Sequence, residues 1–83
     1  QYRWTQFTVP ELFGDDPFEL PRLSHMSNGV VDRLNQGDFA PFYEWLESAH
    51  VDAEALEAMR TLDADEFTEF QKHWADGVDI PKS

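Results

Sequence analysis

The sequence predicts a mainly α-helical fold, a small bundle of three to four short helices preceded by an extended N-terminal arm or short strand. Between Ser27 and Gly77, apolar and aromatic residues recur at the spacing of one face of a helix. Acidic or Ser residues that can cap a helix punctuate this pattern at short intervals. Short connections of this kind place neighbouring helices side by side or at steep angles.

The N-terminal segment is predicted to be extended. Residues 2–9 are rich in aromatic, Thr and β-branched residues and alternate with a period of two. Residues 10–22 contain three Pro residues, a Gly and two consecutive Asp residues, which predict a loop. We therefore divide the chain into an arm and Pro-rich loop (1–22), a helical domain (23–77) and a short C-terminal tail (78–83).

Each of the four predicted helices has a start signal and a stop signal. The predicted N-terminal caps are Ser24 or Ser27, Asp38, Asp52 and Asp63. The predicted ends lie near Gly37, Ala49, Thr61 and Gly77. Asp63 is followed three residues later by Glu66, the spacing of a capping box.

Large apolar side chains fall into two groups by their position in the sequence. Those that follow the helical stripes are expected to fill a common core: Phe39, Phe42, Leu46, Phe67, Phe70 and Trp74. Those outside a clear stripe are expected either to dock over the helices or to contact a partner, and are the candidate partner-binding residues: Tyr2, Trp4, Phe7, Phe13, Phe18 and Trp45.

Charge restricts the classes of partner. Seventeen acidic residues against six basic ones give a net charge of −11, spread along the whole chain. Binding to nucleic acid or to an anionic membrane surface is disfavoured by this charge. The absence of cysteine excludes a disulfide framework and thiol chemistry. No apolar run approaches the roughly 18 residues of a membrane span.

No constellation of residues predicts catalysis, a cofactor or a metal. Glu47 and His50 have the Glu-x-x-His spacing of di-iron bundles, but the second pair that such a site needs is missing. Asp32 and Gly37 match two positions of a calcium-binding EF-hand loop, yet Tyr43 occupies the place of its bidentate Glu. We therefore expect a protein that is not an enzyme and acts through its surface.

The order of elements also resembles a known family. The residues that carry the resemblance are Leu20, Pro21, Gly29, Val30, Val31, Phe42, Trp45, Leu46, Glu54, Leu56, Met59, Leu62, Glu66, Phe67 and Trp74. This pattern of residue classes across residues 20–77 resembles the tail assembly chaperones of long-tailed bacteriophages, particularly those that infect actinobacteria. Related proteins often place a compact hairpin before the Leu-Pro step, where the acidic loop of residues 14–17 predicts irregular structure here.

The resemblance implies a small acidic helical protein in the cytoplasm of the infected bacterial host. Its partner would be the tape measure protein, which such chaperones keep soluble until the tail tube polymerises around it. Self-association would multiply weak contacts into avidity. Two alternatives remain, an acidic DNA mimic that inhibits a nucleic-acid-binding enzyme, and a minor structural subunit of the virion.

Overall fold

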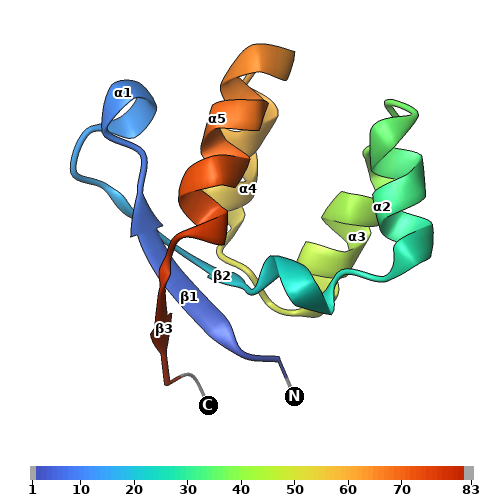
Figure 1. Cartoon of the computed structure of the whole chain (residues 1–83), viewed down its shortest axis with the longest axis horizontal. Coiled ribbons are helices and arrows are strands. Elements are labelled where there is room, and N and C mark those ends of the chain that lie inside the picture. The colour runs from blue at the N-terminus through green and yellow to red at the C-terminus, as the bar shows by residue number, and fades with distance from the viewer. Residues whose placement is uncertain (1, 82–83) are drawn as a thin grey trace.

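The computed structural model describes residues 2–81, and Gln1, Lys82 and Ser83 lie outside the described residues. Residues 2–81 contain five α-helices, one 3₁₀ turn and three strands (Figure 1). In chain order these are β1 (Trp4–Thr8), α1 (Pro10–Phe13), β2 (Pro17–Pro21), the 3₁₀ turn η1 (Leu23–His25), α2 (Asn28–Asn35), α3 (Ala40–Ser48), α4 (Ala53–Arg60), α5 (Ala64–Ala75) and β3 (Val78–Ile80). Helices α2 to α5 gather on one side of the sheet, and α1 is part of the connection between β1 and β2.

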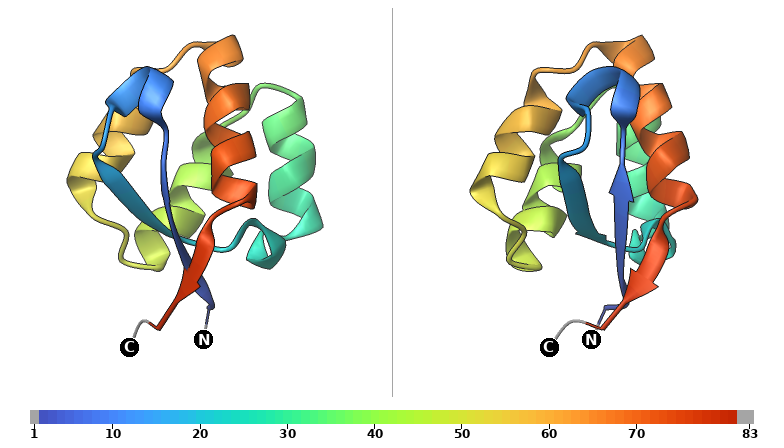
Figure 2. Two further views of the ribbon diagram at one scale, coloured as in Figure 1. Left: turned by 60° about the vertical axis from the view of Figure 1, so that its left-hand side comes forward. Right: turned by 90° about the vertical axis from the view of Figure 1, so that its left-hand side faces the viewer.

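The predicted fold class, a helical bundle with an extended arm, is wrong because both ends of the described chain join one antiparallel sheet. The strand order is β2-β1-β3, with the N-terminal strand in the middle. Residue Trp4 pairs with Pro21 on one side and with Ile80 on the other. The right-hand view of Figure 2 shows β1 between β2 and β3. The fold is therefore a small sheet covered by helices.

The predicted loop at residues 10–22 is wrong, because α1 and β2 both form within it. Strand β2 tolerates Pro17 and Pro21, since neither needs an N–H bond to β1. The backbone N–H of Arg22 donates to the carbonyl of Arg3 at 2.8 Å, so hydrogen-bonded pairs alternate from that point along the hairpin. Pro17 and Pro21 fall at the alternate positions, whose N–H groups would point away from β1. Between them Phe18 and Leu20 are buried and Glu19 is exposed, which is the period-two pattern of a half-buried strand.

Three of the predicted helix starts are confirmed by their hydrogen bonds. The Ser27 hydroxyl accepts from the N–H of Val30, and the Asp52 carboxylate accepts from the N–H of Glu54. Asp63 and Glu66 form a complete capping box, with N···O distances of 2.8 and 2.9 Å. The Asp38 carboxylate accepts from the N–H of Ala40. Asp38 lies one residue before Phe39, which is the N-terminal cap of α3.

The sheet and the helices share one aromatic core. Five of the six predicted core residues are buried, and Phe39 is half-buried against the same cluster. The Trp74 ring lies near the middle of this core, 6.2 Å from Phe7 and 6.0 Å from both Phe42 and Phe70. Its indole Nε1 donates a buried hydrogen bond to the Pro21 carbonyl at 3.0 Å. This bond joins the last turns of α5 to the end of β2. Residues 2–22 and the helical residues 23–77 therefore share one core.

Gly77 allows the chain to pass from α5 into β3 at close range to β1. A Cβ atom at this position would lie 2.3 Å from Thr5 Oγ1 and 3.0 Å from the Gln6 carbonyl oxygen. The Thr5 hydroxyl donates to the Val78 carbonyl at 3.2 Å, so it cannot turn away without losing that bond. Gly77 therefore does more than end a helix, since it sets how closely β3 approaches β1.

Gly77→Ala is expected to lower the free energy of unfolding by about 1–3 kcal/mol, because the added methyl overpacks the contact with Thr5 and Gln6. Urea denaturation followed by circular dichroism measures this. The matched control is Gly29→Ala, where the new Cβ meets only Ser27 Oγ at 3.9 Å. The control should raise stability by roughly 0.5–1 kcal/mol, since Gly is unfavourable within a helix. Equal effects of the two substitutions would contradict the close approach.

A second backbone constraint lies at the end of α3. His50 has a φ of 64°, in the left-handed region, and the following N–H of Val51 bonds to the Leu46 carbonyl at 3.2 Å. The same helix-ending motif after α2 uses Gly37, with a φ of 84°.

His50→Gly is therefore expected to raise the free energy of unfolding by about 1 kcal/mol, because Gly adopts this conformation without strain. The reciprocal Gly37→His variant should lower it by a similar amount. Thermal unfolding of both variants is the measurement, and a less stable His50→Gly protein would show that the imidazole makes contacts that outweigh the strain.

Candidate binding site

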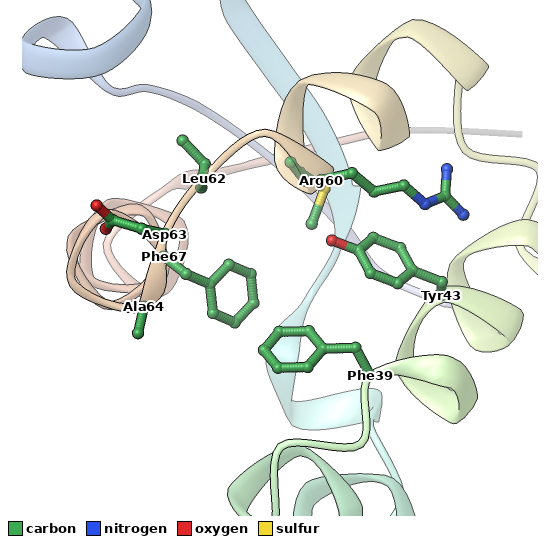
Figure 3. Close-up of a pocket in the computed structure, with 8 residues that line it drawn as sticks. Phe39, Tyr43, Arg60, Leu62, Asp63, Ala64 and Phe67 are labelled. Atoms are coloured by element: carbon green, nitrogen blue, oxygen red, sulfur yellow. The ribbon is translucent and has the colours of Figure 1, made fainter.

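A cavity of about 500 Å³ opens between the ends of three helices (Figure 3). We call it the three-helix cavity, and its lining residues are Phe39, Tyr43, Met59, Arg60, Leu62, Asp63, Ala64 and Phe67. Phe39 immediately precedes α3 and Tyr43 lies one turn later. The α4–α5 turn contributes Leu62 and Asp63, and the capping box of α5 holds this turn in place.

The walls of the three-helix cavity are largely aromatic. The Phe39 and Phe67 rings meet edge to face at 5.3 Å, and the rings of Phe39 and Tyr43 stack at 6.3 Å. In Figure 3 these side chains project toward the space between the helices. Edge-to-face and offset pairs of this kind hold their rings in fixed orientations. The cavity can therefore receive apolar side chains against a preformed wall.

Arg60 is the one cation among the lining residues. Its guanidinium carbon lies 4.5 Å from the centre of the Tyr43 ring, within the range of a cation–π contact. The guanidinium nitrogens of Arg60 lie 3.6 Å from a carboxylate oxygen of Glu57 and 3.8 Å from one of Glu47. Burial raises the pKa of the Tyr43 phenol above its ordinary value of 10.0, and the Arg60 charge opposes this rise. The phenol is therefore neutral at physiological pH.

The six predicted partner-binding residues do not lie in this cavity. Trp4, Phe7 and Phe18 are buried in the core, which matches the alternative that they dock over their own helices. Phe13 is half-buried and packs 5.1 Å from the Phe18 ring. These four side chains present little surface to a partner.

Tyr2 and Trp45 lie together elsewhere on the surface. Their rings meet at 6.1 Å, with Tyr2 39% exposed and Trp45 half-buried. The Trp45 ring also stacks on Trp74 at 6.5 Å, so it belongs partly to the core. Tyr2 and Trp45 stay predicted contacts for a partner, whereas the sequence analysis missed the three-helix cavity. The sequence contained evidence for the three-helix cavity, because Phe39 and Phe67 lie near helix ends and line it. The sequence analysis placed both residues in the core alone.

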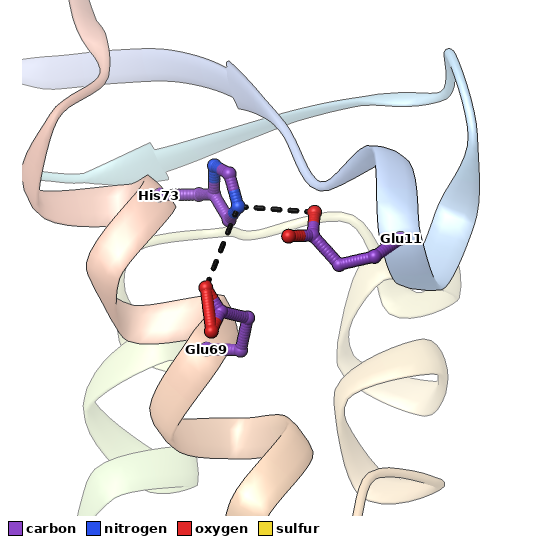
Figure 4. A group of neighbouring side chains, drawn as sticks. All are labelled: Glu11, Glu69 and His73. Atoms are coloured by element: carbon purple, nitrogen blue, oxygen red, sulfur yellow. Dashed lines mark ion pairs between the residues drawn. The ribbon is translucent and has the colours of Figure 1, made fainter.

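A second cluster brings together two carboxylates and an imidazole that are distant in the sequence (Figure 4). The His73 Nε2 atom lies 3.1 Å from Glu11 Oε1 and 3.9 Å from Glu69 Oε2. Glu11 stands in α1, and the other two residues stand one turn apart on α5. The pKa of Glu11 lies below its ordinary value of 4.5, mainly because a backbone N–H bonds to its carboxylate and also because of His73. The Glu47–His50 pair lies elsewhere, with Glu47 facing Arg60.

Within the described residues, no helix is both long enough and apolar enough to cross a membrane. Comparison of the chain with protein-family models, with curated proteins and with solved structures found no match.

The environment of Tyr43 gives a testable pH dependence. In a Tyr2→Phe variant, which leaves Tyr43 as the sole tyrosine, the phenol should ionise with a pKa above 10.0. The raised pKa means that the folded state disfavours the charged phenolate. The free energy of unfolding is therefore at its full value below the unfolded-state pKa near 10.0 and falls as pH rises through the folded-state pKa. Tyrosinate absorbance measures the ionisation, and urea denaturation at increasing pH measures the loss.

Adding Arg60→Gln to the Tyr2→Phe variant should raise the pKa of Tyr43 further, since the nearby positive charge favours the phenolate. A pKa at or below 10.0 in the first variant would contradict a buried phenol. A lower pKa after removal of Arg60 would contradict the contact between the guanidinium and the ring.

Proposed function

We propose that this chain is a non-enzymatic tail assembly chaperone of a long-tailed bacteriophage. In this role it binds the tape measure protein in the host bacterial cytoplasm and keeps it soluble while the tail is assembled. The proposal rests on the resemblance of residues 20–77 to that family and on one feature of the structure, the three-helix cavity. An open apolar cavity on a strongly acidic protein supports a binding role.

The size and lining of the cavity suit side chains of a partner helix. Its volume of about 500 Å³ falls within the roughly 300–1,000 Å³ of typical ligand pockets. Amphipathic helices bind other proteins by inserting apolar side chains, spaced three or four residues apart, into grooves of this kind. The aromatic wall formed by Phe39, Tyr43 and Phe67 would anchor them.

The charge of the chain supports a helper that must not aggregate with its client. The net charge of −11 opposes nonspecific aggregation of the chain and favours a partner that is apolar or basic. Nucleic acid and anionic membranes are not proposed as partners for the same reason. Weak self-association would let several cavities engage one long client, which raises the overall affinity without new contacts.

The hairpin also supports the family assignment. The sequence analysis noted an irregular acidic loop where related proteins often carry a hairpin before the Leu-Pro step. In this chain β1 and β2 pair from Trp4 with Pro21 to Thr8 with Pro17, so a hairpin precedes Arg22. Residues 14–16 form an irregular turn as expected, and the Leu20–Pro21 step lies within β2 of the hairpin.

The test is capture of the tape measure protein by the tagged chain from infected or co-expressing cells, at low and at high salt, with mass spectrometry of the captured proteins. We expect capture to survive high salt, because apolar burial is not screened by ions. Recovery of a basic nucleic-acid enzyme that salt releases would instead support the DNA mimic. Incorporation of the chain into purified virions would support the structural subunit.

The variant that tests the cavity is Ala64→Arg, at an exposed position on the rim, in the first turn of α5. A long charged side chain there should obstruct the cavity and lower capture at least about tenfold. The matched control is Ala53→Arg, at the equivalent first position of α4 and outside the cavity lining. Both changes place a cation at a helix N-terminus, so an equal loss of capture in the two variants would contradict binding in the cavity.

A further inference from the structure

We infer that Glu11, Glu69 and His73 form a binding site for a single Zn²⁺ ion that links α1 to α5. Glu69 and His73 are four residues apart on α5 and therefore share one face of the helix. The connection after β1 brings Glu11 of α1 to the same place, as Figure 4 shows. One ligand atom from each residue lies within 4.8 Å of the others.

The spacing of the three side chains fits a tetrahedral metal. Zinc lies about 2.0–2.2 Å from nitrogen and carboxylate ligands, which places the ligand atoms roughly 3.4 Å from one another. The distances from His73 Nε2 to the two carboxylates, 3.1 and 3.9 Å, bracket this value. A small rotation of the Glu69 side chain would bring all three atoms to the ion.

The surroundings of the imidazole nitrogen are consistent with the same site. The His73 side chain is one-third exposed, but its Nε2 atom is shielded from solvent and lies between the two carboxylates, with Glu11 Oε1 at 3.1 Å outside the geometry of a hydrogen bond. In a metal site the ion occupies the lone-pair direction of the nitrogen, and the other ligand atoms lie to the side. Atoms that are near one another without a hydrogen bond are the arrangement that a shared cation requires.

The donor set selects the ion. One imidazole nitrogen and two carboxylates suit zinc, which keeps a fourth position for water when the protein supplies three ligands. Calcium and magnesium prefer oxygen ligands alone, so the imidazole counts against both. The charge of −11 attracts any cation diffusely, and the test must therefore separate a specific site from this background.

The ion would stabilise α1, a short helix whose side chains are at most half-buried. Helix α1 is four residues long and has no fully buried side chain. A ligand that binds only the folded state raises the unfolding temperature, and the rise grows with the logarithm of ligand concentration above the dissociation constant. Zinc across α1 and α5 would therefore fix the β1–β2 connection against the helix that carries Trp74.

The experiment uses the full chain stripped with EDTA, with zinc chloride as the probe in calorimetric titration and thermal unfolding. We expect one Zn²⁺ per chain and a rise in the unfolding temperature of roughly 5 °C when free zinc is about fivefold above its dissociation constant, with little change in equal magnesium. His73→Gln should weaken zinc binding at least about tenfold and abolish the rise. Should that variant fail to fold, Glu69→Gln, at a partly exposed position, is expected to give the same loss.

The control is His50→Asn, which removes the imidazole beside Glu47 while keeping a residue that tolerates a positive φ. Zinc binding should be unchanged in this variant. Zinc binding that survives His73→Gln, or that magnesium matches, would overturn the inference and leave Glu11 and His73 as an ion pair alone.

Discussion

The hydrogen bond from the Trp74 indole to the Pro21 carbonyl is the contact on which the two layers of the fold depend. In a hairpin edge strand, alternate carbonyls face away from the neighbouring strand and need another donor. At Pro21 that donor is Trp74 of α5, 3.0 Å away and buried. A buried acceptor without a partner would cost about 1–3 kcal/mol, so the bond fixes the position of α5 over the sheet. The rings of Phe7, Phe42 and Phe70 pack around it.

This arrangement also explains why the three-helix cavity lies at the far end of α5. Trp74 anchors the C-terminal half of the helix to the sheet, whereas the first turn extends past the sheet to the α4–α5 connection. There the capping box satisfies the backbone without apolar contacts, so the helix needs no cover on its exposed side. Phe67 and Phe39 can therefore pack on each other and leave an opening beside them.

Local signals in the sequence predicted helices α2 to α5 well but missed α1 and most of the sheet. Ser27, Asp52 and Asp63 act on N–H groups two or three residues away, so their role is legible from spacing alone. Strand β2 was missed because the effect of Pro17 and Pro21 depends on register, which only the partner strand defines. Strand β3 has three residues, too few to show a period. The Glu11–Glu69–His73 cluster was missed because its members meet only through the fold.

The central position of β1 has a consequence for how the chain folds during synthesis. Its partner β3 contains Val78–Ile80, so one whole edge of β1 stays unpaired until nearly all the residues described here have left the ribosome. Pairing across that distance closes a long loop, and the entropy cost of closure slows this step of folding. Until closure, the free edge of β1 is open to strands of other chains. During that interval the net charge of −11 opposes association of the unpaired edge with other acidic chains.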